Sequence, residues 1–177
     1  MKKFGLIGEK LGHSYSPLIH SKFGDYDYEL LETTEEDLDT LISSKEFGGF
    51  NVTIPYKKKV MALCDKVSEK ARTIGSVNTI VRQADGRLAG YNTDYFGFQY
   101  LLTAAGIQVK GLKCMILGSG GASLTVQAVL EDLGAKEIVV ISRKGENNYE
   151  NIKTHFDSEI IINTTQLVCT PTMESPQ

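Results

Sequence analysis

The sequence has few cysteines and lacks long hydrophobic runs. Cys64, Cys114 and Cys169 are widely spaced and include no C-x-x-C pair, which indicates reduced thiols. No apolar run approaches the roughly eighteen residues that a membrane-spanning helix needs. The first residues, from Met1 to Phe4, lead into a glycine-rich segment without the hydrophobic core of a signal peptide. We therefore expect a cytoplasmic protein that does not act at a membrane.

Metal-ligand spacing and strong charge of one sign are also missing. The three histidines, His13, His20 and His155, share no metal-ligand spacing, so we expect no structural metal. A net charge of −3 argues against nucleic acid as the main partner. The 41% hydrophobic and 23% charged residues are typical of a globular protein, and 177 residues suffice for one ordinary domain or two small ones.

The most informative stretch runs from Lys113 to Arg143. A short apolar run ending at Leu117 is followed by a glycine-rich turn, Gly118-Ser119-Gly120-Gly121-Ala122-Ser123. Apolar residues then recur at helical spacing, at Val126, Val129, Leu130 and Leu133. The β-branched run from Glu137 to Ile141 predicts a buried parallel strand. This order of strand, glycine turn, helix and strand favours a dinucleotide-binding βαβ unit, whose helix N-terminus faces the pyrophosphate.

Two features of this unit leave alternatives open. Ser123 occupies the third glycine position, so an ordinary glycine-rich turn is the competing interpretation. After the second strand, Ser142, Arg143 and Lys144 replace the acidic residue that would bind the ribose of NAD. A guanidinium binds phosphate oxygens through two N–H groups, which favours NADP over NAD. A solvated basic loop is the alternative.

The first part of the chain predicts a mixed α/β domain. Strands are expected at 4–8, 26–31, 47–54, 76–81 and 88–91, the last two joined by a hairpin at Asp85-Gly86. Helices are expected at 17–23, after Thr34, at 60–64, from Ser68, and from Thr93 to Gly106. We place this domain at residues 1–105 and a second, nucleotide-binding domain at residues 106–177.

Several polar residues lie next to these strand and helix ends. Ser14 and Ser16 precede the first helix, where capping is the ordinary role, although two hydroxyls there can also bind a polyol or a carboxylate. Lys57 lies just beyond a strand's carboxyl end, where open α/β folds bind ligands, although three adjacent lysines also suit a solvated face. Asp94 falls in the first turn of a helix, a position that the helix dipole alone would favour.

Five motifs in order identify a family resemblance. They are Gly12-His13-Ser14-Tyr15-Ser16-Pro17, Asn51-Val52-Thr53-Ile54-Pro55-Tyr56-Lys57, Gly75-Ser76-Val77-Asn78-Thr79, Gly90-Tyr91-Asn92-Thr93-Asp94 and the glycine turn that starts at Gly118. Together they resemble shikimate dehydrogenase. The resemblance implies an NADP-dependent enzyme that reversibly reduces 3-dehydroshikimate to shikimate, on the route to chorismate and the aromatic amino acids. It also implies a substrate domain, a Rossmann-type NADP domain and an active site in the cleft between them.

The resemblance implies roles for individual residues. Lys57 and Asp94 match the catalytic pair. Matches to substrate contacts are Ser14, Ser16, Asn51, Thr53 and Asn78. Matches to the pyrophosphate turn are Gly118, Ser119, Gly120, Gly121 and Ala122, while Ser142 and Arg143 resemble the family's clamp on the 2′-phosphate.

The tail departs from the family pattern. A third strand of the second domain is expected at 159–162, and Asn163-Thr164-Thr165 matches a loop near the cofactor. Family chains continue through further strands and a C-terminal helix, so we expect only a partial Rossmann-type domain here. Its exposed sheet edge would favour association into a homo-oligomer. Two alternatives to the main interpretation are a quinate/shikimate dehydrogenase and a catalytically inert truncated fragment that only binds a ligand or partner.

Overall fold

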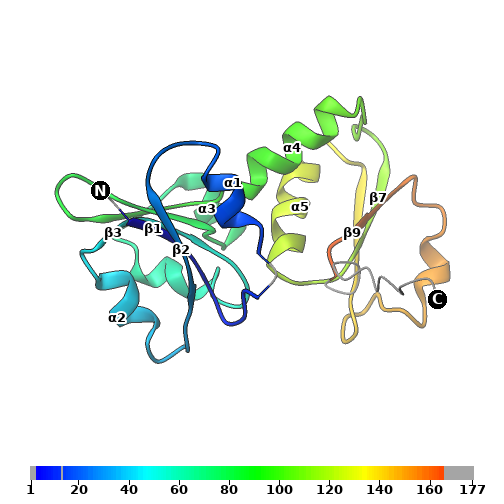
Figure 1. Cartoon of the computed structure of the whole chain (residues 1–177). Helices are drawn as coiled ribbons and strands as arrows, with labels where there is room; N and C mark the ends of the chain where they lie inside the picture. Colours follow the sequence, from blue (N-terminus) through cyan, green and yellow to red (C-terminus); the bar gives the residue numbers. More distant parts are fainter. Residues whose placement is uncertain (1–2, 13, 166–177) are drawn as a thin grey trace, which may run out of the picture. The chain divides into compact units, whose positions relative to one another are not determined.

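The computed structural model describes residues 3–12 and 14–165, and it divides into two compact units, residues 1–97 and 98–177 (Figure 1). Both units contain parallel strands with helices, which confirms the predicted α/β class. The helix α4 (Asp94–Ala104) runs across the division between the units. The domain limits expected at residues 105 and 106 stay a prediction. Among the described residues, no helix has both the length and the apolar character that crossing a bilayer requires.

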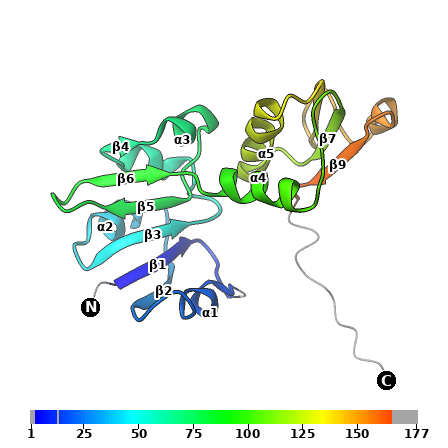
Figure 2. The ribbon, with the colours of Figure 1, turned by 90° about the horizontal axis from the view of Figure 1, so that it is seen from above.

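The described part of the first unit forms a six-stranded mixed sheet in the order β2-β1-β3-β5-β6-β4 (Figure 2). Its strands are β1 (Lys3–Gly8), β2 (Asp27–Glu32), β3 (Phe47–Val52), β4 (Lys66–Val67), β5 (Thr79–Arg82) and β6 (Leu88–Tyr91). Strand β1 is parallel to β2 and β3, whereas β5 is antiparallel to β3 and β6. The carboxyl ends of β1, β2, β3 and β6 therefore share one edge of the sheet with the beginning of β5.

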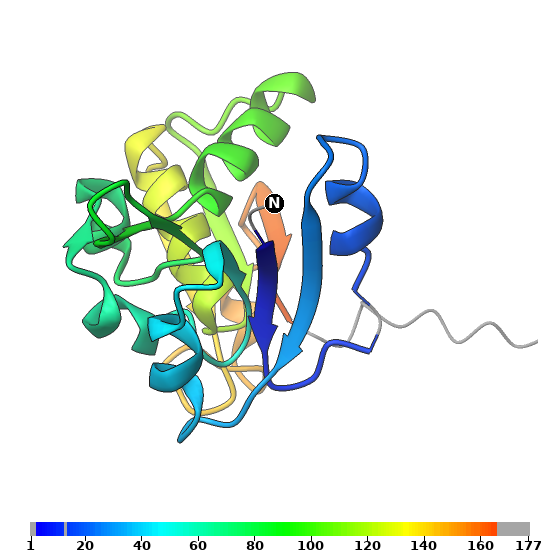
Figure 3. The same cartoon turned by 60° about the vertical axis from the view of Figure 1, so that its left-hand side comes forward.

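The core of this unit lies between the sheet and three helical segments. They are α2 (Leu38–Ser43), the 3₁₀ helix η1 (Lys59–Leu63) and α3 (Glu69–Ile74). Their buried side chains pack with those of the strands in one cluster, which includes Ile7, Leu38, Ile42, Phe50, Val60, Ala71 and Ile80. The remaining helix, α1 (Ser16–His20), lies beside the edge strand β2 (Figure 3).

Several helix starts differ from the predictions. Ser68 caps α3 as expected, because its side chain accepts the N–H of Ala71. The helix expected after Thr34 begins only at Leu38, because the Thr34 hydroxyl accepts the N–H of Asp37 and closes a turn. The prediction that Ser16 caps α1 is wrong, since Ser16 is itself the first helical residue.

The second unit contains a three-stranded parallel sheet in the order β8-β7-β9 within its described residues. The strands are β7 (Lys113–Leu117), β8 (Glu137–Ile141) and β9 (Ile160–Asn163). The helix α5 (Gly121–Asp132) follows β7, and a 3₁₀ helix, η2 (Ile152–His155), which the sequence did not predict, precedes β9. The predicted strand, glycine turn, helix and strand are therefore confirmed.

Candidate functional site

The predicted substrate residues gather along one edge of the six-stranded sheet. Asn51 belongs to β3, and Thr53 and Lys57 follow it. Asn78 immediately precedes β5, and Asp94 comes three residues after β6. Because the ends of these strands lie at the same edge, residues separated by up to 43 positions in sequence come together.

The strongest contact at this edge joins Lys57 and Asp94. Lys57 Nζ donates to Asp94 Oδ2 at 2.6 Å, and the two side chains keep 18% and 43% of their exposure. An ammonium retains further N–H donors and a carboxylate has a second oxygen, so the pair can also bind a ligand. The sequence placed both residues at the site, and the structure brings them into direct contact.

The backbone around this pair is held by a short connecting segment. Val77 N–H donates to the carbonyl of Lys57 at 2.8 Å. The buried Asn92 donates from Nδ2 to the carbonyl of Ser76 at 3.0 Å, and its Oδ1 accepts the N–H of Tyr95 at 3.2 Å in the first turn of α4. Residues 76 and 77 therefore connect the loop that carries Lys57 to the helix that carries Asp94.

Two asparagine amides next to this pair are oriented by neighbouring hydroxyls. Asn78 Oδ1 accepts the N–H of Thr93 at 2.8 Å, and its Nδ2 donates to the Thr93 hydroxyl at 3.0 Å. Asn51 Oδ1 accepts the Tyr28 hydroxyl at 2.7 Å, while Nδ2 faces the Thr79 hydroxyl at 3.4 Å. Each amide has two N–H donors, so each can bind a further acceptor.

Ser14 and Ser16 bind each other at the start of α1. Ser14 Oγ donates to Ser16 Oγ at 3.1 Å and accepts the N–H of Ser16 at 3.2 Å. Ser14 thus satisfies the first helical N–H, the capping role that the sequence assigned to Ser16. Thr53 N–H donates to the Ile7 carbonyl at 2.9 Å, which joins the ends of β3 and β1. His13, which lies in the same motif, falls outside the described residues.

Sequence reasoning missed Tyr28 as a residue connected to this site. Its ring stacks on His20, with 3.7 Å between the ring centroids and 14° between the planes. Burial raises the pKa of Tyr28 to about 12. No local pattern marks this residue, because its partner Asn51 lies 23 positions further along the chain.

The predicted pyrophosphate turn lies between β7 and α5. Gly118 has a φ of +105°, and a Cβ there would lie 2.8 Å from the hydroxyl of Thr164. Among the described residues, a Cβ on Gly120 would meet no heavy atom within 4 Å, and Gly121 begins the helix. The free N–H groups of the first helical turn therefore face an open space that suits an anion. Ser119 and Ala122 are exposed beside them.

Ser123 is fully buried where the third glycine would allow close packing of helix on strand. Its hydroxyl accepts Gln127 Nε2 at 3.2 Å, so the departure from the glycine pattern is satisfied inside the helix. The loop after β9 closes the other side of the turn. Thr164 Oγ1 donates to the Leu117 carbonyl at 2.8 Å, and Asn163 Oδ1 accepts the N–H of Thr165 at 2.9 Å.

The predicted 2′-phosphate residues follow β8. Ser142 N–H donates to the Asn147 carbonyl at 3.0 Å, which closes a loop on which Arg143 and Lys144 are exposed. Asn151 Nδ2 donates to the Glu146 carbonyl at 2.9 Å and supports the same loop. Both Arg143 and the glycine turn thus follow carboxyl ends of adjacent parallel strands, the edge at which such sheets bind ligands.

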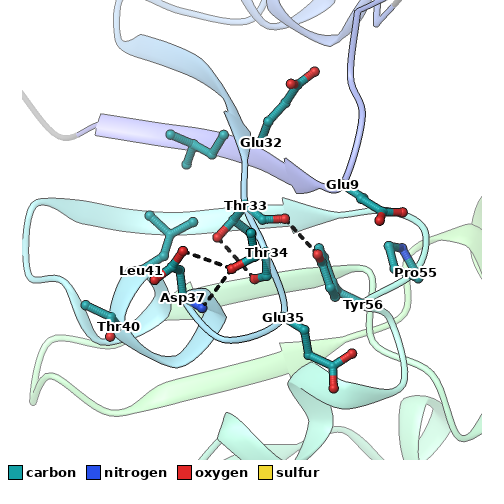
Figure 4. Close-up of a pocket in the computed structure, with 11 residues that line it drawn as sticks. Glu9, Glu32, Thr33, Thr34, Glu35, Asp37, Thr40, Leu41, Pro55 and Tyr56 are labelled. Carbon is teal, nitrogen blue, oxygen red and sulfur yellow. Dashed lines mark hydrogen bonds between the residues drawn. The ribbon is translucent and has the colours of Figure 1, made fainter.

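A hollow of about 720 Å³ lies beside β2 and α2 (Figure 4). Its described lining contains none of the predicted site residues and consists of Glu9, Leu31, Glu32, Thr33, Thr34, Glu35, Asp37, Thr40, Leu41, Pro55 and Tyr56. Three of its carboxylates are already engaged, Glu32 with the N–H of Leu11, Glu35 with Lys59 and Asp37 with the Thr34 hydroxyl. No group of three or more His, Cys, Asp or Glu side chains in the described chain could hold a metal ion.

The chain is similar to known proteins over most of its length. Residues 6–80 match the shikimate dehydrogenase substrate binding domain. The NADP(+) shikimate dehydrogenase of Clostridium perfringens is 46% identical over 161 residues, covering 86% of this chain and 59% of the relative. That of Clostridium beijerinckii is 42% identical over 194 aligned positions, covering 98% of this chain and 71% of the relative.

Two solved structures are similar over almost the whole chain. Shikimate dehydrogenase 1 from Peptoclostridium difficile has a TM-score of 0.88 at 39% identity, covering 98% of this chain and 70% of its own. The Thermus thermophilus enzyme, in complex with NADP(H) and shikimate, has a TM-score of 0.81 at 32% identity, covering 93% of this chain and 69% of its own. The chain spans 59% of the length of the first C. perfringens relative. On these similarities, the chain belongs to the shikimate dehydrogenase family.

Proposed function

We propose that this chain carries the substrate-binding and NADP-binding elements of a shikimate dehydrogenase, which interconverts 3-dehydroshikimate and shikimate. The single observation that supports this most is the 2.6 Å contact between Lys57 and Asp94 at the edge where the amides of Asn51 and Asn78 also lie. A ring bearing several hydroxyls requires donors and acceptors at fixed positions. This edge supplies an ammonium, a carboxylate and two amides.

The roles follow from the chemistry of these side chains. NADPH, when bound, supplies the hydride that reduces the ring ketone. Lys57 donates a proton to the ketone oxygen as negative charge develops there, and accepts it back in the oxidation direction. Asp94 orients the ammonium through the contact at 2.6 Å and leaves its other oxygen for a substrate hydroxyl. Ser14, Ser16, Asn51, Thr53 and Asn78 are proposed to hold the remaining substrate groups.

The second unit offers a fitting site for the cofactor. A pyrophosphate needs close access to backbone N–H groups, and Gly120 leaves that space open at the start of α5. The turn from Gly118 to Ala122 is proposed to hold the pyrophosphate. Ser142 and Arg143 are proposed to bind the 2′-phosphate, because a guanidinium on an exposed loop pairs well with phosphate oxygens. No residue is assigned to a metal.

Turnover tests the proposal directly. Shikimate-dependent reduction of NADP, followed by absorbance, is expected in the parent chain and should fall about a thousandfold or more in Lys57→Ala, since general acid–base catalysis contributes about 10²–10⁴-fold. NADP affinity should be unchanged. Lys58→Ala, which removes the adjacent exposed ammonium, is the matched control and should retain parental turnover. The same assay with NAD tests the preference for the 2′-phosphate.

Equal loss of turnover in the Lys57 and Lys58 variants would contradict the catalytic assignment. Two other candidates remain within the family. A quinate/shikimate dehydrogenase would turn over quinate in the same assay. A chain that only binds ligands or a partner would bind shikimate and NADP in calorimetry without turnover.

We infer that the chain works in the cytoplasm on a small molecule, with neither nucleic acid nor membrane as a partner, in keeping with its net charge of −3. Association of copies into a homo-oligomer would cover the edges of the three-stranded sheet. Light scattering of the purified chain measures that association.

A further inference from the structure

Tyr28 connects helix α1, through His20, to Asn51 on strand β3. Its hydroxyl donates to Asn51 Oδ1 at 2.7 Å, the shortest side-chain contact that Asn51 makes among those described above. The ring is fixed by its stack on His20, with centroids 3.7 Å apart. Tyr28 therefore has one defined ring position and one defined direction for its O–H.

The direction of that O–H determines the orientation of the Asn51 amide. The phenol has a single proton, which it donates to Asn51, so Asn51 turns its carbonyl oxygen toward it. Asn51 Nδ2 then faces the Thr79 hydroxyl at 3.4 Å, and Thr79 in turn donates to Asn78 Oδ1 at 3.1 Å. The donors thus run in one direction along the edge, in the order Tyr28, Asn51, Thr79, Asn78.

We propose that Tyr28 is a positioning residue for substrate binding, which acts by holding the Asn51 amide with an N–H directed to the ligand. An asparagine amide can turn over by 180°, and the reversed amide would present a carbonyl oxygen in place of a donor. The O–H of Tyr28 removes that alternative. The inference rests on the proposed function for the identity of the ligand, whereas the positioning of Asn51 can be measured without it.

The chain offers a closely matched control two residues away. Tyr26 also carries a half-buried phenol near His20, but its hydroxyl lies 2.8 Å from His20 Nδ1 and does not contact Asn51. Tyr28→Phe and Tyr26→Phe each remove one hydroxyl and keep the ring. Only the first removes the donor to Asn51, so the comparison isolates that hydrogen bond.

Two measurements follow on the full chain. In ligand-free samples labelled with ¹⁵N, Tyr28→Phe should shift and broaden the side-chain amide signals of Asn51, whereas Tyr26→Phe should leave them in place. In calorimetry with shikimate alone, Tyr28→Phe should weaken binding about fivefold to tenfold, the ordinary worth of one hydrogen bond. Tyr26→Phe should change it less than twofold. NADP affinity should be parental in both variants.

A double-mutant cycle shows whether Tyr28 acts through Asn51. In an Asn51→Ala background, Tyr28→Phe should produce no further loss of shikimate affinity. A loss that persists in that background, Asn51 signals that do not respond to Tyr28→Phe, or a Tyr28→Phe chain that no longer folds would each overturn the proposal. A parent chain that binds no shikimate would instead refute the proposed function, and the amide signals would still decide the positioning of Asn51.

Discussion

Replacement of Gly118 by alanine should destabilise the second unit through the backbone alone. Gly118 has a φ of +105°, beyond the ordinary left-handed region, and a side chain at positive φ costs about 1–2 kcal/mol. The new Cβ would lie 2.8 Å from Thr164 Oγ1 and 3.3 Å from the backbone carbon of Thr164. Since that hydroxyl donates to the Leu117 carbonyl at 2.8 Å, moving it also costs about 1 kcal/mol.

The opposing effect on the unfolded chain is smaller. Alanine lowers the conformational entropy of the unfolded state, which stabilises the folded chain by about 0.4–1 kcal/mol. The net loss is therefore about 1–2.5 kcal/mol, or roughly 3–10 °C in the melting temperature. Thermal unfolding followed by far-ultraviolet circular dichroism measures this shift.

Gly120→Ala is the matched control, because Gly120 has a φ of −78° and open space around it in the described chain. Its stability should change by about 1 kcal/mol or less, yet its NADP affinity should fall at least tenfold, since the methyl enters the space proposed for the pyrophosphate. A Gly118→Ala chain as stable as Gly120→Ala would refute the backbone argument. Undiminished NADP affinity in Gly120→Ala would refute the proposed turn.

Two further predictions concern stability and thiol chemistry. Arg82 donates to four backbone carbonyls around the end of α2, the start of β3 and the β5–β6 turn, so Arg82→Met should lower the free energy of unfolding by about 2–3 kcal/mol in urea titrations. Arg72→Met, with one such bond to Val67, should cost less than half as much, and equal losses would contradict the argument. Burial raises the pKa of Cys64 to about 11 and also raises that of Cys114. Both therefore keep their protons at pH 8, and a Cys169→Ser chain should react slowly with iodoacetamide at that pH until it unfolds. Rapid alkylation of the folded chain would contradict it.

The sequence predicts the strands best where the apolar pattern is local. The run from Glu137 to Ile141 and the return strand from Leu88 to Tyr91 have the predicted bounds, since β-branched residues and a hairpin signal mark them. Helix starts are less accurate, because serine and threonine hydroxyls can close turns as readily as they cap helices. Thr34 does the former, and α2 begins four residues later.

The site is predictable to the extent that motifs mark it. Lys57 and Asp94 could be paired from the family resemblance, and the structure brings them to 2.6 Å. The residues that orient the neighbouring amides could not be found in this way. Tyr28 reaches Asn51 only because β2 and β3 flank the same strand, and pairings of this kind follow from the sheet order.

The short connection at residues 76 and 77 couples the positions of the two charged groups. The carbonyl of Lys57 and the side chain of Asn92 both bind this connection, so the loop with the ammonium and the helix with the carboxylate share one set of hydrogen bonds. Local opening of residues 76 and 77 would loosen both groups, while the hydrogen bond from the Thr93 N–H to Asn78 Oδ1 would still hold the start of the helix. A disturbance of this connection is therefore expected to move the ammonium and the carboxylate together.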